Sequence, residues 1–545
     1  MALILKKPFL LNCLIGIVLT GAALLLTIPS FLKETTVGHD LLYHLNWAEC
    51  FQTQFFEGDF YPRWLFEMKG GRGSPVFYYY GPLPYYVSTL FAAVLPETNN
   101  ILVSLGATYC FALLASSIGV YWFFRLSKSH GSAFLFTLLY MLYPYHLVAD
   151  LYIRFAFGEF FAIAWVPFLF IAIKKLAENC KTAMPFLAIF YALLILSHIP
   201  TTLLVTPVLL LYFIILSERK TTIYRVLLAF ILGIGMAAFY LLPMTDLINA
   251  VSLEKMTTGH SFYKNAFLMS GEILHTKHEE FRTILHYLAI ATLVATITML
   301  FSNRKPTSET LFFGAVSLFS LFMMYPPSQF LWDFLPLLQR VQFPWRFFIV
   351  ISFSLFFLET SHNRMIKPLF TRYSKALYLV ILGSLAVITI YFAYLEATQQ
   401  ISSANKTTIT KSERIKVGAI EYLPIYSPER IYEQVANRTL ASVKEHLIGK
   451  EAHIDYAVTF SGHQILASIE TPKSQDIILQ QYYFPTWQAS DVNESKLLDV
   501  TRAPNGMIGF TLPKGRHKIS FSHKKTPNEK ASNIISIFSL GIVLL

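Results

Sequence analysis

Long apolar blocks decide what this chain can fold into. The stretch from about Phe9 to Phe31 is almost entirely apolar, and comparable blocks recur along the first 395 of its 545 residues. A helix that crosses a bilayer needs roughly 20 such residues in succession. Only 14% of the residues are charged, against roughly 25% in soluble domains. The sequence therefore predicts a polytopic membrane protein.

Cationic loops between the apolar blocks predict its orientation. Lys and Arg are concentrated in short connections such as 125–130, 174–181 and 218–225, and loops of this kind face the cytoplasm. They also account for the net charge of +11, so we expect no nucleic-acid partner. Together with a final apolar segment, the pattern gives about eleven or twelve spans. The main ones are 8–31, 101–124, 131–149, 156–174, 183–199, 200–217, 226–244, 285–302, 309–325, 345–361 and 376–395.

The predicted spans divide the chain into three parts. Residues 1–395 form a helical membrane domain in which 32–100 make a long first outer loop with interfacial helices. Residues 396–531 show short alternating apolar runs separated by turn signals such as APNG and LPKG, a pattern typical of a β-sandwich-like domain. Residues 532–545 form an apolar anchor. The predicted fold class is mostly α, a polytopic helical bundle with a C-terminal β domain outside the cytoplasm.

The first outer loop opens with ionisable residues. Asp40 and His44 are four residues apart, so they share one face of a helix. A carboxylate and an imidazole in this arrangement can bind a divalent cation or act as acid–base partners. They can equally form a polar collar on the first span. Glu57 and Asp59 flank Gly58 and either add oxygen ligands or only belong to a turn; the sequence leaves these alternatives open.

Further candidates come from the other outer segments. An arginine fork matches phosphate oxygens, whether of a substrate or of ordinary lipid headgroups. Glu159 should lie at the outer end of a span, where a carboxylate needs a partner such as Arg154. His198 lies at a predicted break between two apolar blocks, where backbone can line a cavity. The candidate phosphate-binding arginines are Arg63, Arg154, Arg340 and Arg346.

Several motifs resemble a known family of membrane proteins. They include HDLLYHL (39–45), GDFYPRW (58–64), DLYIRFAFGE (150–159), LSHIPTT (196–202) and QFPWRF (342–347). The chain resembles the bacterial multi-pass proteins labelled as related to 6-pyruvoyl-tetrahydropterin synthase, and the YfhO-type membrane proteins. The pterin label implies no chemistry here, because the sequence lacks the closely spaced His pair, H-x-H, of the soluble synthase.

The order of elements also resembles the GT-C class of membrane glycosyltransferases, which use lipid-phosphate-linked sugars and keep a functional acid in the first outer loop. This resemblance implies that Asp40 is a general base or metal ligand, with His44, Glu57 and Asp59 beside it. It also implies membrane lipids, a polyprenyl-phosphate sugar donor and a glycan or lipid acceptor as partners, at the outer face of a bacterial inner membrane.

One departure from the GT-C pattern leaves the cofactor open. His39 precedes Asp40, so the first loop has no adjacent acidic pair, and use of a divalent cation is not settled. Two other functions also fit the sequence. One is a transporter or flippase of a lipid-linked intermediate, and the other is a non-catalytic assembly protein of the cell envelope.

Overall fold

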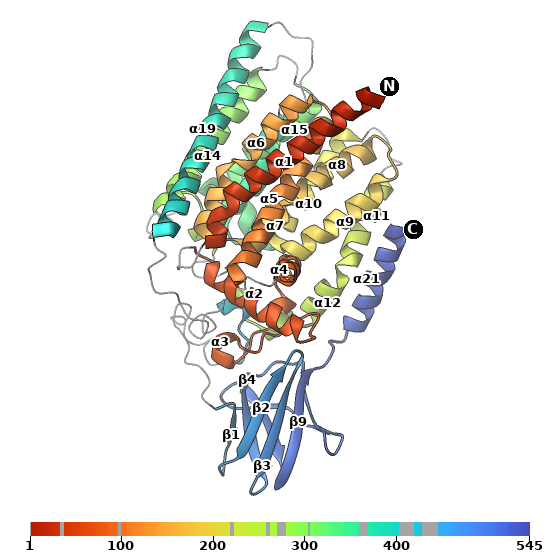
Figure 1. The fold of residues 1–545 in the computed structure, drawn as a ribbon, viewed down its shortest axis with the longest axis vertical. Coiled ribbons are helices and arrows are strands. Elements are labelled where there is room, and N and C mark those ends of the chain that lie inside the picture. Colours follow the sequence, from red (N-terminus) through yellow and green to blue (C-terminus); the bar gives the residue numbers. More distant parts are fainter. Residues whose placement is uncertain are drawn as a thin grey trace.

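A helical bundle with a β domain at one end makes up the protein (Figure 1). The computed structural model describes residues 2–32, 38–95, 100–217, 223–257, 262–269, 279–302, 306–358, 368–402, 419–427 and 445–545. Parts of the predicted first outer loop (33–37 and 96–99) and of the predicted β-rich domain (403–418 and 428–444) lie outside the described residues. So do all or part of three predicted cytoplasmic loops, at 218–222, 303–305 and 362–367.

Each predicted span coincides with an apolar helix. In the described part of the chain, seven helices are long and apolar enough to cross a membrane, or up to nine if two bent helix pairs each count as one span. The predicted spans 183–199 and 345–361 correspond to shorter apolar helices at Ala183–Ser197 and Pro344–Phe357. The helices are α1 (Ala2–Leu32), α5 (Ile101–Arg125), α6 (His130–Met141), η3 (Tyr145–Arg154), α7 (Phe157–Ile163), α8 (Val166–Ala177), α9 (Ala183–Ser197), α10 (Ile199–Leu216), α11 (Ile223–Met236), α12 (Ala238–Asp246), α14 (Glu279–Ser302), α15 (Ser308–Met323), α18 (Phe347–Phe357) and α19 (Pro368–Ser402).

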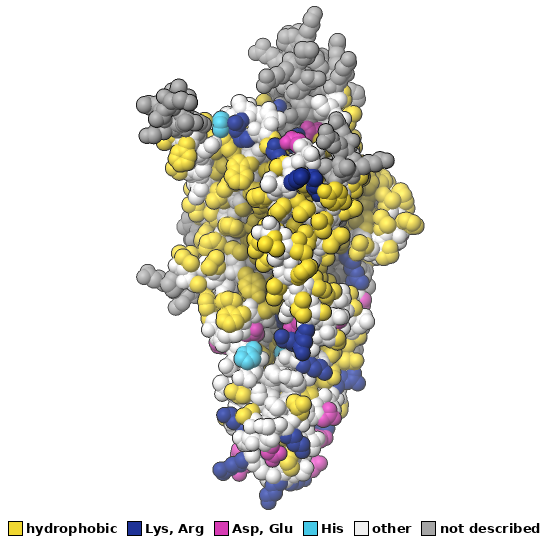
Figure 2. Space-filling model, turned by 90° about the vertical axis from the view of Figure 1, so that its right-hand side faces the viewer, with side chains coloured by type: hydrophobic (Ala, Val, Ile, Leu, Met, Phe, Trp, Pro, Cys, Tyr) yellow, Lys and Arg dark blue, Asp and Glu magenta, His cyan; other side chains and the backbone are white. Residues whose placement is uncertain are grey.

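The surface separates a hydrophobic middle from charged ends. Hydrophobic side chains cover the face of the bundle shown in Figure 2, and charged side chains gather toward both of its ends. The side chains of Leu25, Ile231 and Val387 are each exposed by more than 60%. Apolar side chains so freely exposed are expected in lipid rather than in water. The mostly helical membrane fold predicted from the sequence is therefore confirmed.

Short helices of the first outer loop lie across the end of the bundle that faces the β domain (Figure 1). They are α2 (Leu41–Phe56), α3 (Met68–Gly71), η1 (Val76–Tyr78) and α4 (Leu83–Val94). Pro84 stands in the first turn of α4, where a missing N–H costs no hydrogen bond. Phe51, Phe77 and Tyr85 pack against one another with ring centroids 4.7–6.1 Å apart. The loop is thus an aromatic layer between membrane helices and β domain.

The β domain consists of two antiparallel sheets with strand orders β1-β4-β8-β7 and β2-β3-β9-β5-β6. Ile465, Ala467 and Ile469 alternate along β3 and are almost fully buried, as expected for one face of a half-buried strand. The strands are β1 (Leu447–Gly449), β2 (Asp455–Ser461), β3 (Gln464–Thr471), β4 (Gln475–Tyr482), β5 (Trp487–Asp491), β6 (Lys496–Leu498), β7 (Thr501–Arg502), β8 (Met507–Leu512) and β9 (Gly515–His523).

The domain boundaries differ from those predicted. Helix α19 continues to Ser402, past the predicted boundary at 395. Residues 419–427 pack on the helical part, where Ser252 N donates to Leu423 O and Val251 bridges Pro424. Among the described residues, the first strand begins at Leu447. The final helix α21 (Glu529–Leu544) begins before residue 532 and packs against α11 and α12.

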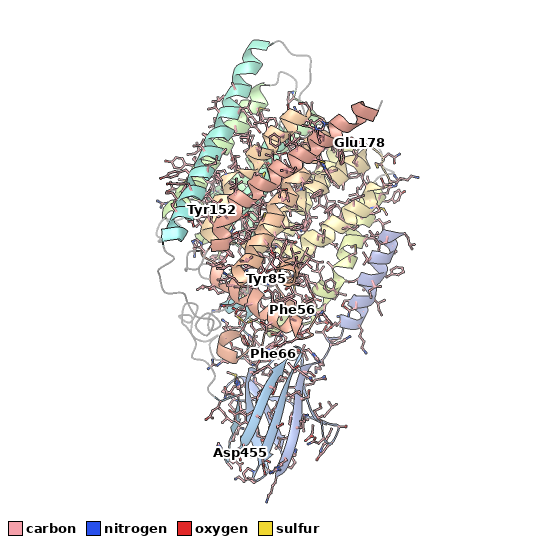
Figure 3. The ribbon with its side chains drawn as sticks, viewed as in Figure 1. Phe56, Phe66, Tyr85, Tyr152, Glu178 and Asp455 are labelled. Carbon is pink, nitrogen blue, oxygen red and sulfur yellow. The ribbon has the colours of Figure 1, made fainter. Side chains whose placement is uncertain are left out.

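The β domain is attached to the first outer loop through Trp64. The Trp64 indole donates to Gln481 Oε1 at 2.9 Å, and Gln481 Nε2 donates to Gly71 O at 2.7 Å. The Trp64 ring lies 5.2–5.5 Å from the rings of Trp487 and His523. Figure 3 shows Phe66 at this junction and Asp455 at the remote tip of the domain. A buried aromatic with its N–H satisfied makes a strong anchor.

Gly73 tests this junction. Its φ is +85°, and a Cβ atom there would overlap Trp64 Nε1 and Gln481 Oε1. We expect Gly73→Ala to lower the unfolding free energy by about 1–3 kcal/mol through overpacking and to lower the thermal midpoint of the purified protein. Gly383→Ala in α19 is the matched control, since nothing lies within 4 Å of its Cβ. Equal midpoints for the two variants would contradict the anchoring role of this junction.

Candidate functional site

A buried charged cluster lies where η3, α7 and the start of α18 meet. Glu159 Oε2 accepts hydrogen bonds from Arg154 Nη1 at 3.2 Å and from Arg346 Nε at 2.8 Å. Glu159 Oε1 accepts from the Tyr145 hydroxyl at 2.7 Å. Arg154 Nη1 also pairs with Asp150 Oδ1 at 2.8 Å. A carboxylate at this depth requires such partners, because an unpaired buried charge is costly.

Unusual backbone brings these side chains together. Residues 145–154 form a π-helix, a winding that is rare and occurs frequently at functional sites. Phe155 then adopts a left-handed conformation with φ of 58°, which costs energy for a bulky residue. This turn ends η3 at Arg154 and starts α7 two residues later, so Glu159 returns toward Arg154. The sequence spacing alone does not reveal this geometry.

Arg346 is held from the other side of the cluster. It ends the short helix η10 (Pro344–Arg346), and its Nη1 donates to Val341 O at 2.7 Å and to Gln342 Oε1 at 2.9 Å. Gln342 has a positive φ of 67°, which turns its side chain and the preceding carbonyl toward the guanidinium. The arginine is therefore fixed in one orientation before any ligand arrives.

Both arginines keep unused donors. Arg154 donates to described residues only through Nη1, and Arg346 only through Nε and Nη1. Both side chains are nearly buried, with 4% of Arg154 and 7% of Arg346 exposed. Two fixed guanidiniums whose remaining N–H groups have no partner among the described residues suit a phosphate or carboxylate.

Asp40 lies beside these arginines. Its backbone N–H donates to Arg154 O at 2.8 Å, and His39 N donates to Ile153 O at 3.2 Å, so the start of the outer loop is bonded to the end of η3. Asp40 as a whole residue is partly exposed. Burial raises the pKa of its carboxyl, and the positive charges of Arg154 and Arg346 oppose this rise. The structure thus brings Asp40, Arg154, Glu159 and Arg346 together.

Aromatic side chains form a wall next to Asp40. The half-buried Tyr80 ring lies 5.1 Å from Trp47, 5.8 Å from His44 and 6.4 Å from Tyr422. Its hydroxyl lies so close to Gly158 that a Cβ there would be 2.7 Å away. Asp40, Arg346 and Glu159 all act electrostatically on Tyr80. Tyr80 therefore links the aromatic wall to the charged cluster.

Sequence reasoning missed Tyr80 and a second acid, Glu421. Glu421 belongs to the short helix η12 (Ile420–Tyr422), and burial raises the pKa of its carboxyl, with Asp40 adding to the rise. The aromatic run FYYYG marks the Tyr80 segment and was a usable signal. Glu421 comes from the polar stretch after the last predicted span, where nothing in the sequence distinguishes it.

The His44 ring is surrounded by aromatic side chains. Among the described residues, no hydrogen bond joins it to the Asp40 carboxylate as an acid–base pair would require. Its Nδ1 is hydrogen-bonded to the Tyr85 hydroxyl at 2.7 Å, and burial lowers the pKa of its imidazole to about 3. Figure 3 shows Tyr85 near the end of the bundle. The predicted pairing of Asp40 and His44 as metal ligands gains no support. Within the described ranges, no three His, Cys, Asp or Glu side chains are grouped to hold a metal ion.

The remaining candidates have other contacts. His198 Nδ1 is hydrogen-bonded to Thr201 Oγ1 at 2.8 Å, and its ring lies 6.4 Å from Tyr80, so it borders the aromatic wall. Asp59 accepts from Tyr61 N at 3.2 Å within its own turn. Exposed Arg340 reaches Leu253 O at 3.5 Å.

Glu57 and Arg63 connect the first loop to C-terminal segments. Glu57 Oε2 accepts from Gly462 N at 3.0 Å, and Arg63 pairs with Glu529 at 2.7 Å. The hydrogen bonds and ion pairs of Glu57, Asp59, Arg63 and Arg340 with described residues join them to other residues and not to Asp40. The charged side chains of Glu57 and Arg63 thus join the first outer loop to the C-terminal segments.

Comparison with known proteins gives a family. A family model described as "6-pyruvoyl-tetrahydropterin synthase related domain; membrane protein" matches residues 77–395. The chain belongs to this family. The match includes Arg154, Glu159 and Arg346 but begins after Asp40. No curated protein matches the sequence.

The fold also has a distant likeness to solved structures. One of them is described as "Single-Particle Cryo-EM Structure of Arabinofuranosyltransferase AftD from Mycobacteria", with 13% sequence identity and a TM-score of 0.43. The alignment covers 69% of this chain and 26% of that chain, so the aligned part spans about a quarter of the mycobacterial protein.

Glu159 tests the cluster. We expect Glu159→Gln to destabilise the protein by about 3–5 kcal/mol, because two buried arginines lose their shared anion. Glu178→Gln is the control, since Glu178 pairs with Lys175 at the surface with its side chain 51% exposed; surface pairs contribute about 0–1 kcal/mol. Thermal unfolding in detergent measures both, and a Glu159→Gln protein as stable as the control would contradict the anchoring role.

Proposed function

We propose that this protein is a membrane glycosyltransferase that takes a sugar from a polyprenyl-phosphate donor at the outer face of a bacterial inner membrane. The observation that carries the proposal is the placement of Asp40 beside two fixed arginines with unused donors. An anion-binding pair next to a carboxylate suits a reaction in which a hydroxyl attacks and a phosphate leaves. The acceptor is an envelope glycan or lipid.

The reaction assigns one role to each group. The acceptor oxygen attacks the anomeric carbon of the donor sugar, and the bond from that carbon to the phosphate oxygen breaks. Asp40 takes the proton of the acceptor hydroxyl as general base. The bonding electron pair leaves with the phosphate, and the free N–H groups of Arg154 and Arg346 stabilise this growing negative charge. The products are the glycosylated acceptor and the polyprenyl phosphate.

The aromatic wall suits the sugar. Sugar-binding pockets combine apolar surfaces with a few fixed polar groups, and Tyr80 has both a ring in the wall and a hydroxyl near the cluster. The β domain, attached through the same outer loop, is suited to hold the acceptor. This arrangement favours catalysis over the two alternatives, a flippase and a non-catalytic assembly protein.

Asp40 tests the proposal. We expect Asp40→Asn to lower sugar transfer by at least about 100-fold, the usual scale for a general base. The measurement is transfer from radiolabelled polyprenyl-phosphate sugars to envelope acceptors by the full-length protein in membranes. Asp455→Asn is the control, because Asp455 lies at the tip of the β domain with its side chain 86% exposed. Equal transfer by wild type and Asp40→Asn would contradict the proposal. The absence of transfer from any such donor in wild type would favour the alternatives.

The pH profile gives a second test. A general base works only when deprotonated, so activity falls as pH drops through the pKa of Asp40. Arg346 lowers that pKa, so Arg346→Gln raises it and moves the acid limb of kcat/KM to higher pH. Arg346→Lys keeps the positive charge and leaves the limb nearer its wild-type position. An unchanged limb in Arg346→Gln would show that another group titrates.

A further inference from the structure

A lateral groove lies between α14 and α19. It has a volume of about 390 Å³, and the two helices lie side by side at one edge of the bundle (Figure 1). Its lining is apolar except for two hydroxyl groups. The lining residues are Pro144, Thr283, Ile284, Tyr287, Leu288, Leu385, Ile388 and Phe392.

The groove opens toward lipid. Ile284 and Leu288 line its buried wall, whereas Tyr287, also in its lining, is 62% exposed. On α19, Val387 is 66% exposed directly beside the lining residue Ile388. Both helices meet the length and hydropathy criteria for membrane spans. Apolar side chains around the opening therefore face hydrocarbon, and an acyl or isoprenoid chain can enter from the side.

One end of the groove is next to the charged cluster. Phe281 lies on the same face of α14 as Ile284 and Leu288, at i, i+3 and i+7. Its ring lies 5.8 Å from His39 and 5.5 Å from Trp345, the residues that directly precede Asp40 and Arg346. The groove therefore begins about one helical turn from the segments that carry the acid and the arginine.

The helix η3 also connects the groove to the charged cluster. Pro144 lines the groove and stands at the start of η3, which ends at Arg154. Helices α14 and α19 both pack against η3. One π-helix thus has the apolar groove at one end and an arginine of the charged cluster at the other.

We propose that this groove binds the isoprenoid chain of a polyprenyl phosphate whose phosphate lies at Arg154 and Arg346. The fit is one of hydrogen bonding and polarity, since an anionic head meets the remaining N–H donors of two arginines and a long hydrocarbon chain meets an apolar channel that opens to lipid. The inference rests on the proposed function and adds to it the path of the donor lipid.

The test is photocrosslinking of the full-length protein in lipid nanodiscs. The probe is a long-chain polyprenyl phosphate with a photoreactive group in its isoprenoid chain. We expect labelled peptides from 283–288 and 385–392. Ile388→Trp fills the groove and should lower labelling by at least about tenfold, the effect of losing contact with about two buried CH₂ groups. Val387→Trp is the matched control on the lipid-facing side and should label as wild type does.

Two further measurements control for misfolding of the Ile388→Trp variant and identify the lipid that binds. Thr283→Trp, at the exposed rim, should also block labelling without disturbing the packed interior. Unlabelled polyprenyl phosphate should compete, and phosphatidylglycerol should not. Three results would overturn the assignment of the groove. They are labelling spread over other lipid-facing helices, labelling unchanged in both Ile388→Trp and Thr283→Trp, and equal competition by phosphatidylglycerol.

The assay also separates this inference from the proposed function. It measures lipid binding and needs no sugar transfer. Groove labelling without transfer from any donor would refute the enzyme and support the groove, whereas transfer that survives both tryptophan substitutions would refute the groove alone.

Discussion

The site depends on the ion pairs that Glu159 makes with Arg154 and Arg346. The two arginines come from segments almost 200 residues apart in the sequence, and one carboxylate oxygen accepts from both. Inside a membrane domain, neither arginine is stable without an anion nearby. Asp150 and Glu159 balance the formal charges of Arg154 and Arg346, and Asp40 adds a further carboxylate. In the proposed reaction, the phosphate therefore depends on the remaining N–H donors of the two arginines and not on a net positive charge.

The first outer loop connects this cluster to the rest of the protein. Its start is hydrogen-bonded to η3 next to Arg154, its middle is attached to the β domain through Trp64 and Gln481, and Tyr80 extends into the site. Tyr422, from beyond the membrane helices, packs against Trp47 and Tyr79 of the same loop. The same loop thus contacts the β domain, the segment that carries Tyr422 and the charged cluster.

The sequence predicted the architecture better than the site. Span length and alternating strand patterns reflect the local environment of each residue, so the helices and the β-sheets followed from them. Asp40, Arg154, Glu159 and Arg346 were predicted as candidates because ionisable groups are rare near lipid, and the structure brings these four together. Glu57 and Arg63 looked similar in sequence, yet they bind Gly462 and Glu529. Glu421 was missed because only the tertiary packing of 419–427 brings it to Asp40.

The most direct test is a structure of the protein with a bound polyprenyl-phosphate sugar. We predict a phosphate within hydrogen-bond distance of the free guanidinium nitrogens of Arg154 and Arg346, with the sugar between Asp40 and Tyr80. A phosphate bound elsewhere on the outer face, with Asp40 directed away from the sugar, would contradict the proposed site.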